Sequence, residues 1–199
     1  METDIGYAYG ILIAKGVYHD KDLITIETSE NNLLEIAKNK LSLLGNIKIH
    51  TRVRRAKKIY NTQIIFLKIK NNLDIKIGRH KWDVPSRAFF SKEFRIGLLR
   101  ALFDFSGAIR ARLRKSGQKD RSIRLNSLNE NLKKIKELLK MEGINSMIYL
   151  NKKSFVLEIN GKNNLQLYLE RIGFENKTKR DLLEKIINPV SFEQVLSSH

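Results

Sequence analysis

The sequence lacks cysteine entirely and has only 2 prolines among its 199 residues. Without cysteine, a disulfide framework and a thiolate metal site are both excluded. Long apolar runs are missing as well. The longest, residues 5–14, is too short to span a bilayer and lacks the layout of a secretion signal. These absences predict a cytoplasmic protein with no membrane partner.

Negative charge is also scarce. The chain carries 21 Asp and Glu against 38 Lys and Arg, which gives a formal net charge of +17. Because 42% of the residues are hydrophobic, the composition is that of a globular chain and not of a disordered basic tail. An excess of positive charge spread along a folded chain favours a polyanionic partner, and nucleic acid comes first.

The chain contains an internal repeat. Residues 5–16 align with residues 96–107: an isoleucine and a glycine open each segment, and a glycine closes it. Residues 24–36 align in the same way with residues 123–135. Two copies of one structural unit therefore fill the chain.

Each copy predicts the same order of elements, and we place the copies at residues 1–85 and 86–199. An apolar helix ends at Gly16 or Gly107, a residue typical of left-handed helix termini. A hairpin, an amphipathic helix and two further strands follow. Strands are expected at about residues 16–27, 47–50 and 63–66, then 107–126, 147–150 and 155–158, with closing helices near 162–172 and 177–187. This order predicts an α+β fold with helices on one face of each antiparallel sheet.

Small residues recur at every fourth position along the first helix of each copy. They are Gly6, Gly10 and Ala14 in the first copy, and Gly97 and Ala101 in the second. A stripe of this kind lets two helix backbones approach closely. We expect the two helices to pack together and to join the copies about a pseudo-twofold axis. The alternative is that both are ordinary core helices with incidental small residues.

Residues 8–16 and 99–107 resemble the nine-residue motif of the LAGLIDADG homing endonuclease family. The lead-in at residues 84–100 and the ending at residues 172–177 also resemble that family. The resemblance covers essentially the whole chain as a single-chain member with two repeats. It implies a monomer with pseudo-twofold symmetry, in which the antiparallel strands of both repeats form a DNA-binding saddle backed by helices.

In that family, the acidic residue before the final glycine of each motif binds the divalent metals that cleave DNA. Lys15 and Ser106 occupy these positions here. Lysine repels a cation, and serine offers one weak neutral oxygen where a hard cation needs carboxylates. Asp104 matches an earlier acid of the motif, but two residues along a helix rotate it by about 200° from position 106. We therefore expect no catalytic residue, no metal and no other cofactor.

Lys15 has two interpretations. Its ammonium group can donate to a backbone phosphate and so replace the metal as the local positive charge. Alternatively it is an exposed lysine at a helix C-terminus, where a cation is favourable in any protein. Both interpretations remain open at this point.

Positive side chains alternate with apolar ones along the strands of both copies. In residues 108–114 the apolar side chains are expected to face the helices, and three arginines share the opposite face. An antiparallel ribbon fits the major groove of B-DNA, where arginine binds guanine edges and phosphates. The expected DNA-binding residues are Lys15, Lys48, Arg52, Arg54, Arg55, Arg110, Arg112, Arg114, Arg121, Arg124 and Asn126.

The preferred interpretation is a protein that binds double-stranded DNA without cleaving it, either a site-specific binder or a regulator. One alternative is an active homing endonuclease that uses Mg²⁺ with unorthodox residues such as Asp104. Cleavage of a duplex that depends on Mg²⁺ would favour it. The other is an intron splicing cofactor, for which structured RNA would bind more tightly than duplex DNA at equal salt.

Overall fold

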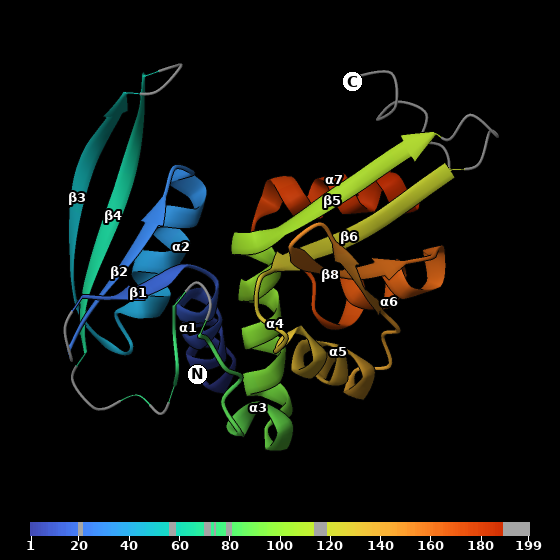
Figure 1. Ribbon diagram of the computed structural model, residues 1–199, viewed down its shortest axis with the longest axis horizontal. Coiled ribbons are helices and arrows are strands. Elements are labelled where there is room, and N and C mark those ends of the chain that lie inside the picture. Colours follow the sequence, from blue (N-terminus) through green and yellow to red (C-terminus); the bar gives the residue numbers. More distant parts are fainter. Residues whose placement is uncertain are drawn as a thin grey trace. The chain divides into compact units, whose positions relative to one another are not determined.

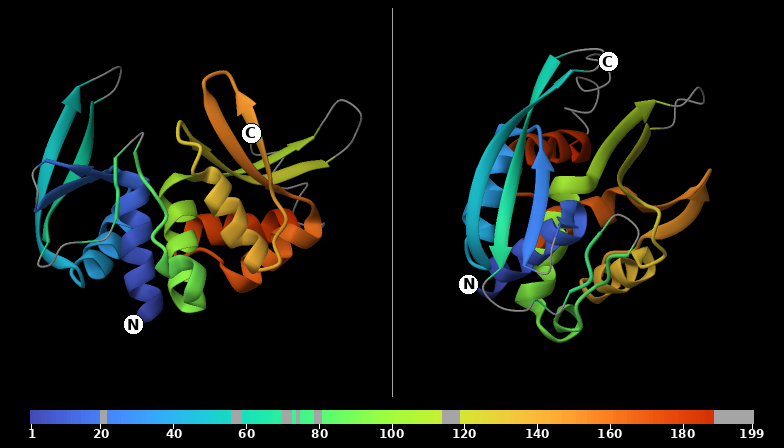
Figure 2. Two further views of the ribbon diagram at one scale, coloured as in Figure 1. Left: turned by 60° about the horizontal axis from the view of Figure 1, so that its bottom comes forward. Right: turned by 60° about the vertical axis from the view of Figure 1, so that its left-hand side comes forward.

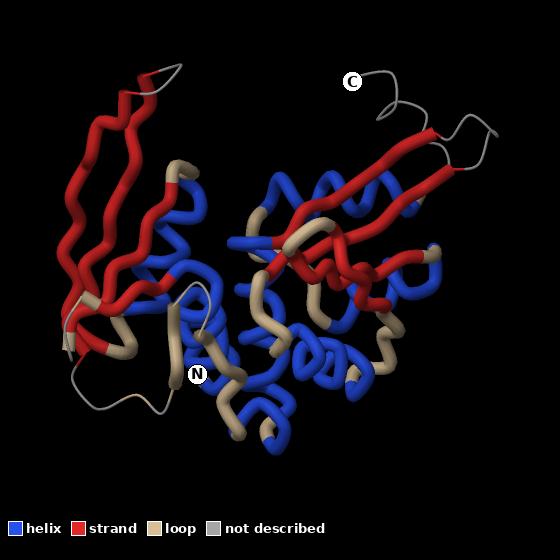
Figure 3. Tube along the Cα trace, viewed as in Figure 1, coloured by secondary structure: helices blue, strands red, loops and turns tan. Residues whose placement is uncertain are grey.

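A computed structural model of the protein describes residues 1–19, 22–55, 59–69, 73, 75–78, 81–113 and 119–188. The chain divides into two compact units, Met1–Phe105 and Ser106–His199 (Figure 1). Each unit contains a four-stranded antiparallel sheet together with helices (Figure 3). The predicted α+β class is confirmed. In the described part of the chain, none of the helices has the length and apolarity that crossing a membrane requires.

The first unit builds its core between the sheet and three of its helices. Its elements are α1 (Glu2–Lys15), β1 (Gly16–Tyr18), β2 (Leu23–Thr28), α2 (Asn31–Leu41), β3 (Gly45–Arg55), β4 (Ile59–Ile69), α3 (Arg87–Phe90) and α4 (Lys92–Ser106). The strand order is β1-β2-β4-β3. Ile24, Ile26 and Ile65 of the strands are fully buried in one cluster with Leu41 of α2 and Ile11 of α1. The opposite face of the sheet stays outside this core.

The second unit repeats the same sheet order, β5-β6-β8-β7. Its elements are β5 (Gly107–Leu113), β6 (Lys119–Ser127), α5 (Leu132–Met141), β7 (Met147–Asn151), β8 (Ser154–Asn160), α6 (Lys162–Arg171) and α7 (Lys177–Ile187). Its helices cover one face of the sheet (Figure 2). Ile123 and Leu125 are buried and alternate with polar residues along β6, and along β8 the buried Leu157 and Ile159 lie on either side of Glu158. The period-2 alternation therefore separates a helix-covered face from an uncovered one.

Helices α1 and α4 pack closely inside the first unit because glycines leave room for the backbones. A Cβ atom added to Gly6 would collide with the backbone of Phe94, and one added to Gly97 would collide with the backbone of Thr3. The predicted small residues found at this contact are Gly6, Gly10, Gly97 and Ala101. Ala14 is half-buried against the core of the first unit. Side chains at the glycine positions would force the two helices apart.

The packing boundary differs from the boundary of the sequence repeat. The repeat assigns residues 86–105 to the second copy, but the compact first unit extends to Phe105. The physical reason is that α4 buries its small-residue stripe against α1. A helix that begins the second copy thus completes the core of the first unit.

Gly16 does not end α1 in the expected left-handed conformation. Its φ of −70° and ψ of 138° are extended, and β1 begins at this residue. Gly107 is likewise absent from the described glycines with positive φ. Glycine is required at position 16 for space, since a Cβ atom there would lie 2.5 Å from the carbonyl oxygen of Leu12. The helix therefore turns directly into the strand at this position.

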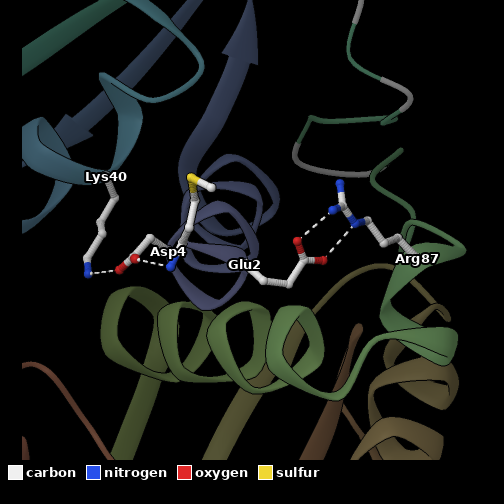
Figure 4. A network of polar contacts seen from close by, with 5 residues as sticks. Glu2, Asp4, Lys40 and Arg87 are labelled. Atoms are coloured by element: carbon white, nitrogen blue, oxygen red, sulfur yellow. Dashed lines mark hydrogen bonds and ion pairs between the residues drawn. The ribbon is translucent and has the colours of Figure 1, made fainter.

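The first turn of α1 is held by ion pairs on two sides (Figure 4). The Lys40 ammonium group donates to Asp4 at 2.6 Å, and the Arg87 guanidinium group donates to Glu2 at 2.8 and 2.6 Å. The hydrogen bond from Lys40, followed by the one from the N-terminal amine, lowers the pKa of Asp4. Acidic side chains also suit the positive end of the helix dipole. These contacts attach the start of α1 to α2 and α3.

Candidate nucleic-acid interface

The uncovered face of the second sheet presents exposed arginines. Arg110 and Arg112 of β5 are both exposed, and the register places them opposite Ser122 and Asp120 of β6. Ile123, the next residue along β6, belongs to the buried side of the sheet. This orientation is the one that the alternation of residues predicts. The result is a helix-free surface on which guanidinium groups lie two residues apart on one strand.

Arg124 lies on the same face and is ion-paired. Its Nε and Nη2 atoms donate to Oε1 of Glu158 at 2.7 and 2.6 Å, across β6 and β8. Burial raises the pKa of the Glu158 carboxyl, but the donor groups of Ser122, Arg124 and Tyr149 outweigh burial and the pKa is lowered overall. Glu158 is therefore an ionised carboxylate at neutral pH, and it fixes the orientation of the Arg124 guanidinium.

Arg121 points in the other direction. Its Nη1 atom donates to the carbonyl oxygen of Ile186 at 3.0 Å. Since α7 ends at Ile187, this bond satisfies one of the carbonyl groups that a helix C-terminus leaves without an intrahelical partner. Alternation along β6 places residue 121 on the same side as Ile123, toward the helices. The expectation that Arg121 contacts DNA does not fit this orientation, and we leave it out of the proposed contacts.

The uncovered face of the first sheet carries cations on its edge strand. Lys48, His50 and Arg52 of β3 are exposed and occupy alternate positions. The ring of His50 packs edge-on against that of Phe66, with the ring centroids 5.1 Å apart. These three residues form a basic strip along β3.

A cavity of about 810 Å³ opens on this face of the first unit. Lys15, the exposed last residue of α1, lines it together with Arg52 of β3. Apolar side chains contribute as well, among them Ile64 and Phe66 of β4. Its remaining charged or titratable lining residues are His19, Glu27 and Glu30. Lys15 and side chains from the uncovered face of the sheet therefore line one cavity.

The other predicted DNA-binding residues are less fully described. Asn126 is exposed at the end of β6. Arg54 and Arg55 lie on β3, where the structure describes only their backbone. Arg114 lies outside the described residues. The candidate interface therefore consists of the predicted residues whose side chains are described and are not turned toward the helices. These are Lys15, Lys48, Arg52, Arg110, Arg112, Arg124 and Asn126.

The residues at the motif ends do not suit a divalent cation. Lys15 carries a positive charge, and half-buried Ser106 offers a neutral hydroxyl group. Asp104 is fully buried and accepts a hydrogen bond of 2.6 Å from the hydroxyl group of Tyr7. Its carboxylate is thereby committed to the contact between α1 and α4. Among the described residues, no group of three or more His, Asp or Glu side chains is placed to hold a metal.

A further cation lies beside the second motif. Nζ of Lys179, in the first turn of α7, donates to the carbonyl oxygen of Gly107 at 2.7 Å. Gly107 directly follows Ser106, so an ammonium group is fixed where β5 begins. Nothing in the sequence pointed to Lys179, because the contact depends on how α7 packs against β5. Both motif ends thus have a lysine amine and no exposed carboxylate of their own.

Part of the sequence matches a known domain family. Residues 93–173 match the family model of the LAGLIDADG-like domain. The resemblance predicted from the sequence is confirmed for this stretch of the chain. No curated protein matches it.

Solved structures of LAGLIDADG proteins share the fold. The N-terminal LAGLIDADG domain of WhiA is 19% identical, with 92% of this chain and 87% of that chain covered and a TM-score of 0.62. Full-length WhiA from Thermatoga maritima is also 19% identical, with 98% and 66% covered and a TM-score of 0.65, so this chain spans 66% of that protein. The homing endonuclease I-WcaI bound to its DNA recognition sequence is 13% identical, with 90% and 85% covered and a TM-score of 0.66. At these identities the likeness shows the fold alone.

Proposed function

We propose that this protein binds double-stranded DNA through the uncovered faces of its two sheets and does not cleave it. The observation that carries the proposal is the pair of exposed guanidinium groups of Arg110 and Arg112 on the helix-free face of β5. A two-stranded antiparallel ribbon fits the major groove, and arginine binds guanine edges and phosphates there. The net charge of +17 supports a phosphate-rich ligand.

The absence of cleavage rests on three positions. Lys15 and Ser106 replace carboxylates at the motif ends, and the carboxylate of Asp104 is buried against Tyr7. Without carboxylate oxygens beside the scissile phosphate, a divalent cation is not held where it would activate water. A lysine at the first motif end instead favours binding to an intact phosphate. The chain then acts as a monomeric, site-specific binder or regulator in the cytoplasm.

The dependence of duplex affinity on salt tests the role of the uncovered face. The double variant Arg110→Ala/Arg112→Ala should bind duplex DNA more weakly and show a flatter plot of log affinity against log salt. Each lost phosphate contact reduces the slope by about 0.9. The matched control is Lys136→Ala/Lys140→Ala, which removes two exposed cations from α5 and should leave the slope unchanged.

Equal slopes for the two double variants would contradict the proposed interface. Tighter binding of a structured RNA than of duplex DNA, measured at the same salt concentration, would contradict the choice of ligand. That second result would favour the splicing cofactor instead.

A further inference from the structure

The uncovered faces of the two sheets carry different chemistry at equivalent positions. Because the two sheets share one strand order, their registers can be matched residue by residue. In the first sheet Thr25 of β2 faces Phe66 of β4. In the second sheet Arg124 of β6 faces Glu158 of β8 at the same place. An ion pair in one repeat thus corresponds to a hydroxyl and an aromatic ring in the other.

The difference extends along the neighbouring strands. Beside Thr25, β1 contributes Val17, which is 50% exposed, whereas the equivalent residue of β5 is Ala108. Next to Phe66 along β4, the half-buried side chain of Ile64 lies on the same face. The centre of the first face is therefore apolar. The second face keeps an apolar residue, Val156, at the position equivalent to Ile64, but it has the ion pair of Arg124 and Glu158 where the first has Thr25 and Phe66.

This apolar centre is accessible and has cations nearby. Val17, Ile64 and Phe66 all line the cavity of about 810 Å³, into which Lys15 and Arg52 also open. A duplex suits both kinds of group, because it brings phosphates for the cations together with apolar groups on its base edges. Glu27 and Glu30 of the same cavity are compatible with base edges, since carboxylates accept hydrogen bonds from cytosine amino groups.

In the major groove, the C5-methyl group of thymine is the apolar feature of the base edges, and side chains read it by contact and not by hydrogen bonding. We propose that Val17, Ile64 and Phe66 of the first sheet read thymine methyl groups, while the second sheet reads its part of the duplex through hydrogen bonds. This inference rests on the proposed function and adds the base chemistry that the first repeat selects.

Replacing thymine by uracil removes only the methyl group and provides the test. The probe is the most enriched duplex from a randomised pool, made once with thymine and once with uracil at each thymine position. For the full wild-type chain, uracil at the contacted positions should weaken binding about fourfold per methyl group, the factor expected for burying one such group. The double variant Val17→Ser/Ile64→Ser should bind the thymine duplex and the uracil duplex equally well. Val17→Ser alone, at a half-exposed position, should halve the effect if the double variant fails to fold.

The matched control changes the equivalent region of the second sheet. Ala108→Ser/Met147→Ser alters two exposed residues there and should keep the full preference for thymine. Equal binding of both duplexes by the wild-type chain would overturn the inference and leave the proposed function standing. If the Val17 variants kept the full preference for thymine, the inference would also be overturned and the proposed function would stand. If no duplex is enriched at all, the proposed function fails and this inference fails with it.

Discussion

Arg124 combines a fixed position with donors left for a ligand. A guanidinium group has five N–H donors, and the hydrogen bonds to Glu158 use its Nε and Nη2 atoms. The side chain of Arg124 is 20% exposed and that of Glu158 is 8% exposed, so the pair is shielded from solvent but still reaches the uncovered face. A guanidinium held in one orientation loses less conformational entropy on binding DNA than a mobile lysine.

The stability of the chain should depend on the charge of Glu158. Because its pKa is lowered in the folded protein, its contribution is present above the ordinary carboxyl pKa and is lost as the pH falls through the lower folded value. We expect Glu158→Gln to reduce the free energy of unfolding at pH 7 by about 1.5–3 kcal/mol, the range for hydrogen bonds to charged groups. The difference from wild type should shrink at an acidic pH below the folded pKa, where the carboxyl is protonated in both states. Urea unfolding at the two pH values measures this.

The control for that variant is Glu130→Gln. Glu130 pairs with Lys133 at 3.3 Å, but both side chains are about two-thirds exposed, at 68% and 69%. An exposed pair of this kind contributes little, so the control should change stability by less than about 0.5 kcal/mol. A difference for Glu158→Gln that is equally large at both pH values would contradict an ionised, paired carboxylate.

Some features of individual residues could be predicted from the sequence, and others could not. Alternation along β5 correctly places Arg110 and Arg112 on one exposed face, since the period of a strand is a local property. Glu158 gave no such signal, because its pairing with Arg124 depends on β8 lying beside β6. The burial of Asp104 depends in the same way on the packing of α4 against Tyr7 of α1. Contacts between distant segments require the fold.

At the scale of elements, the contact between α1 and α4 depends on glycine. A Cβ atom on Gly97 would meet the backbone of Thr3 and of Tyr7, and neither can move without displacing α1. The recurrence of small residues every fourth position was visible in the sequence. Their partners across the contact, such as the Phe94 backbone opposite Gly6, were not.

Gly97→Ala should therefore destabilise the chain although alanine is the better helix former. The gain in helix propensity is about 1 kcal/mol, whereas overpacking a tight contact between backbones costs about 1–3 kcal/mol or more. We expect the free energy of unfolding to fall. Asn39→Ala, an exposed position of α2, serves as control and should stay within about 0.5 kcal/mol of wild type. Stabilisation by Gly97→Ala would contradict the close approach of the helices.

At the scale of the whole molecule, the two units share a sheet topology but differ in the chemistry of their uncovered faces. Both units keep the same strand order, yet one uncovered face is apolar at its centre and the other carries an ion pair. The repeated fold was predictable because hydrophobic periodicity and the turn into each strand recur in both copies. The compact units end at a different residue from the copies, since α4 packs into the first unit.

As proposed above, the protein binds a specific duplex and leaves it intact. The most direct measurement incubates the full chain with a randomised duplex pool in Mg²⁺ and sequences both the bound and the cut molecules. We expect intact molecules that carry one shared motif to be enriched, and we expect no accumulation of cut ends. Cut ends at a shared motif would contradict this proposal, because they would show that Lys15 and Ser106 do not prevent cleavage.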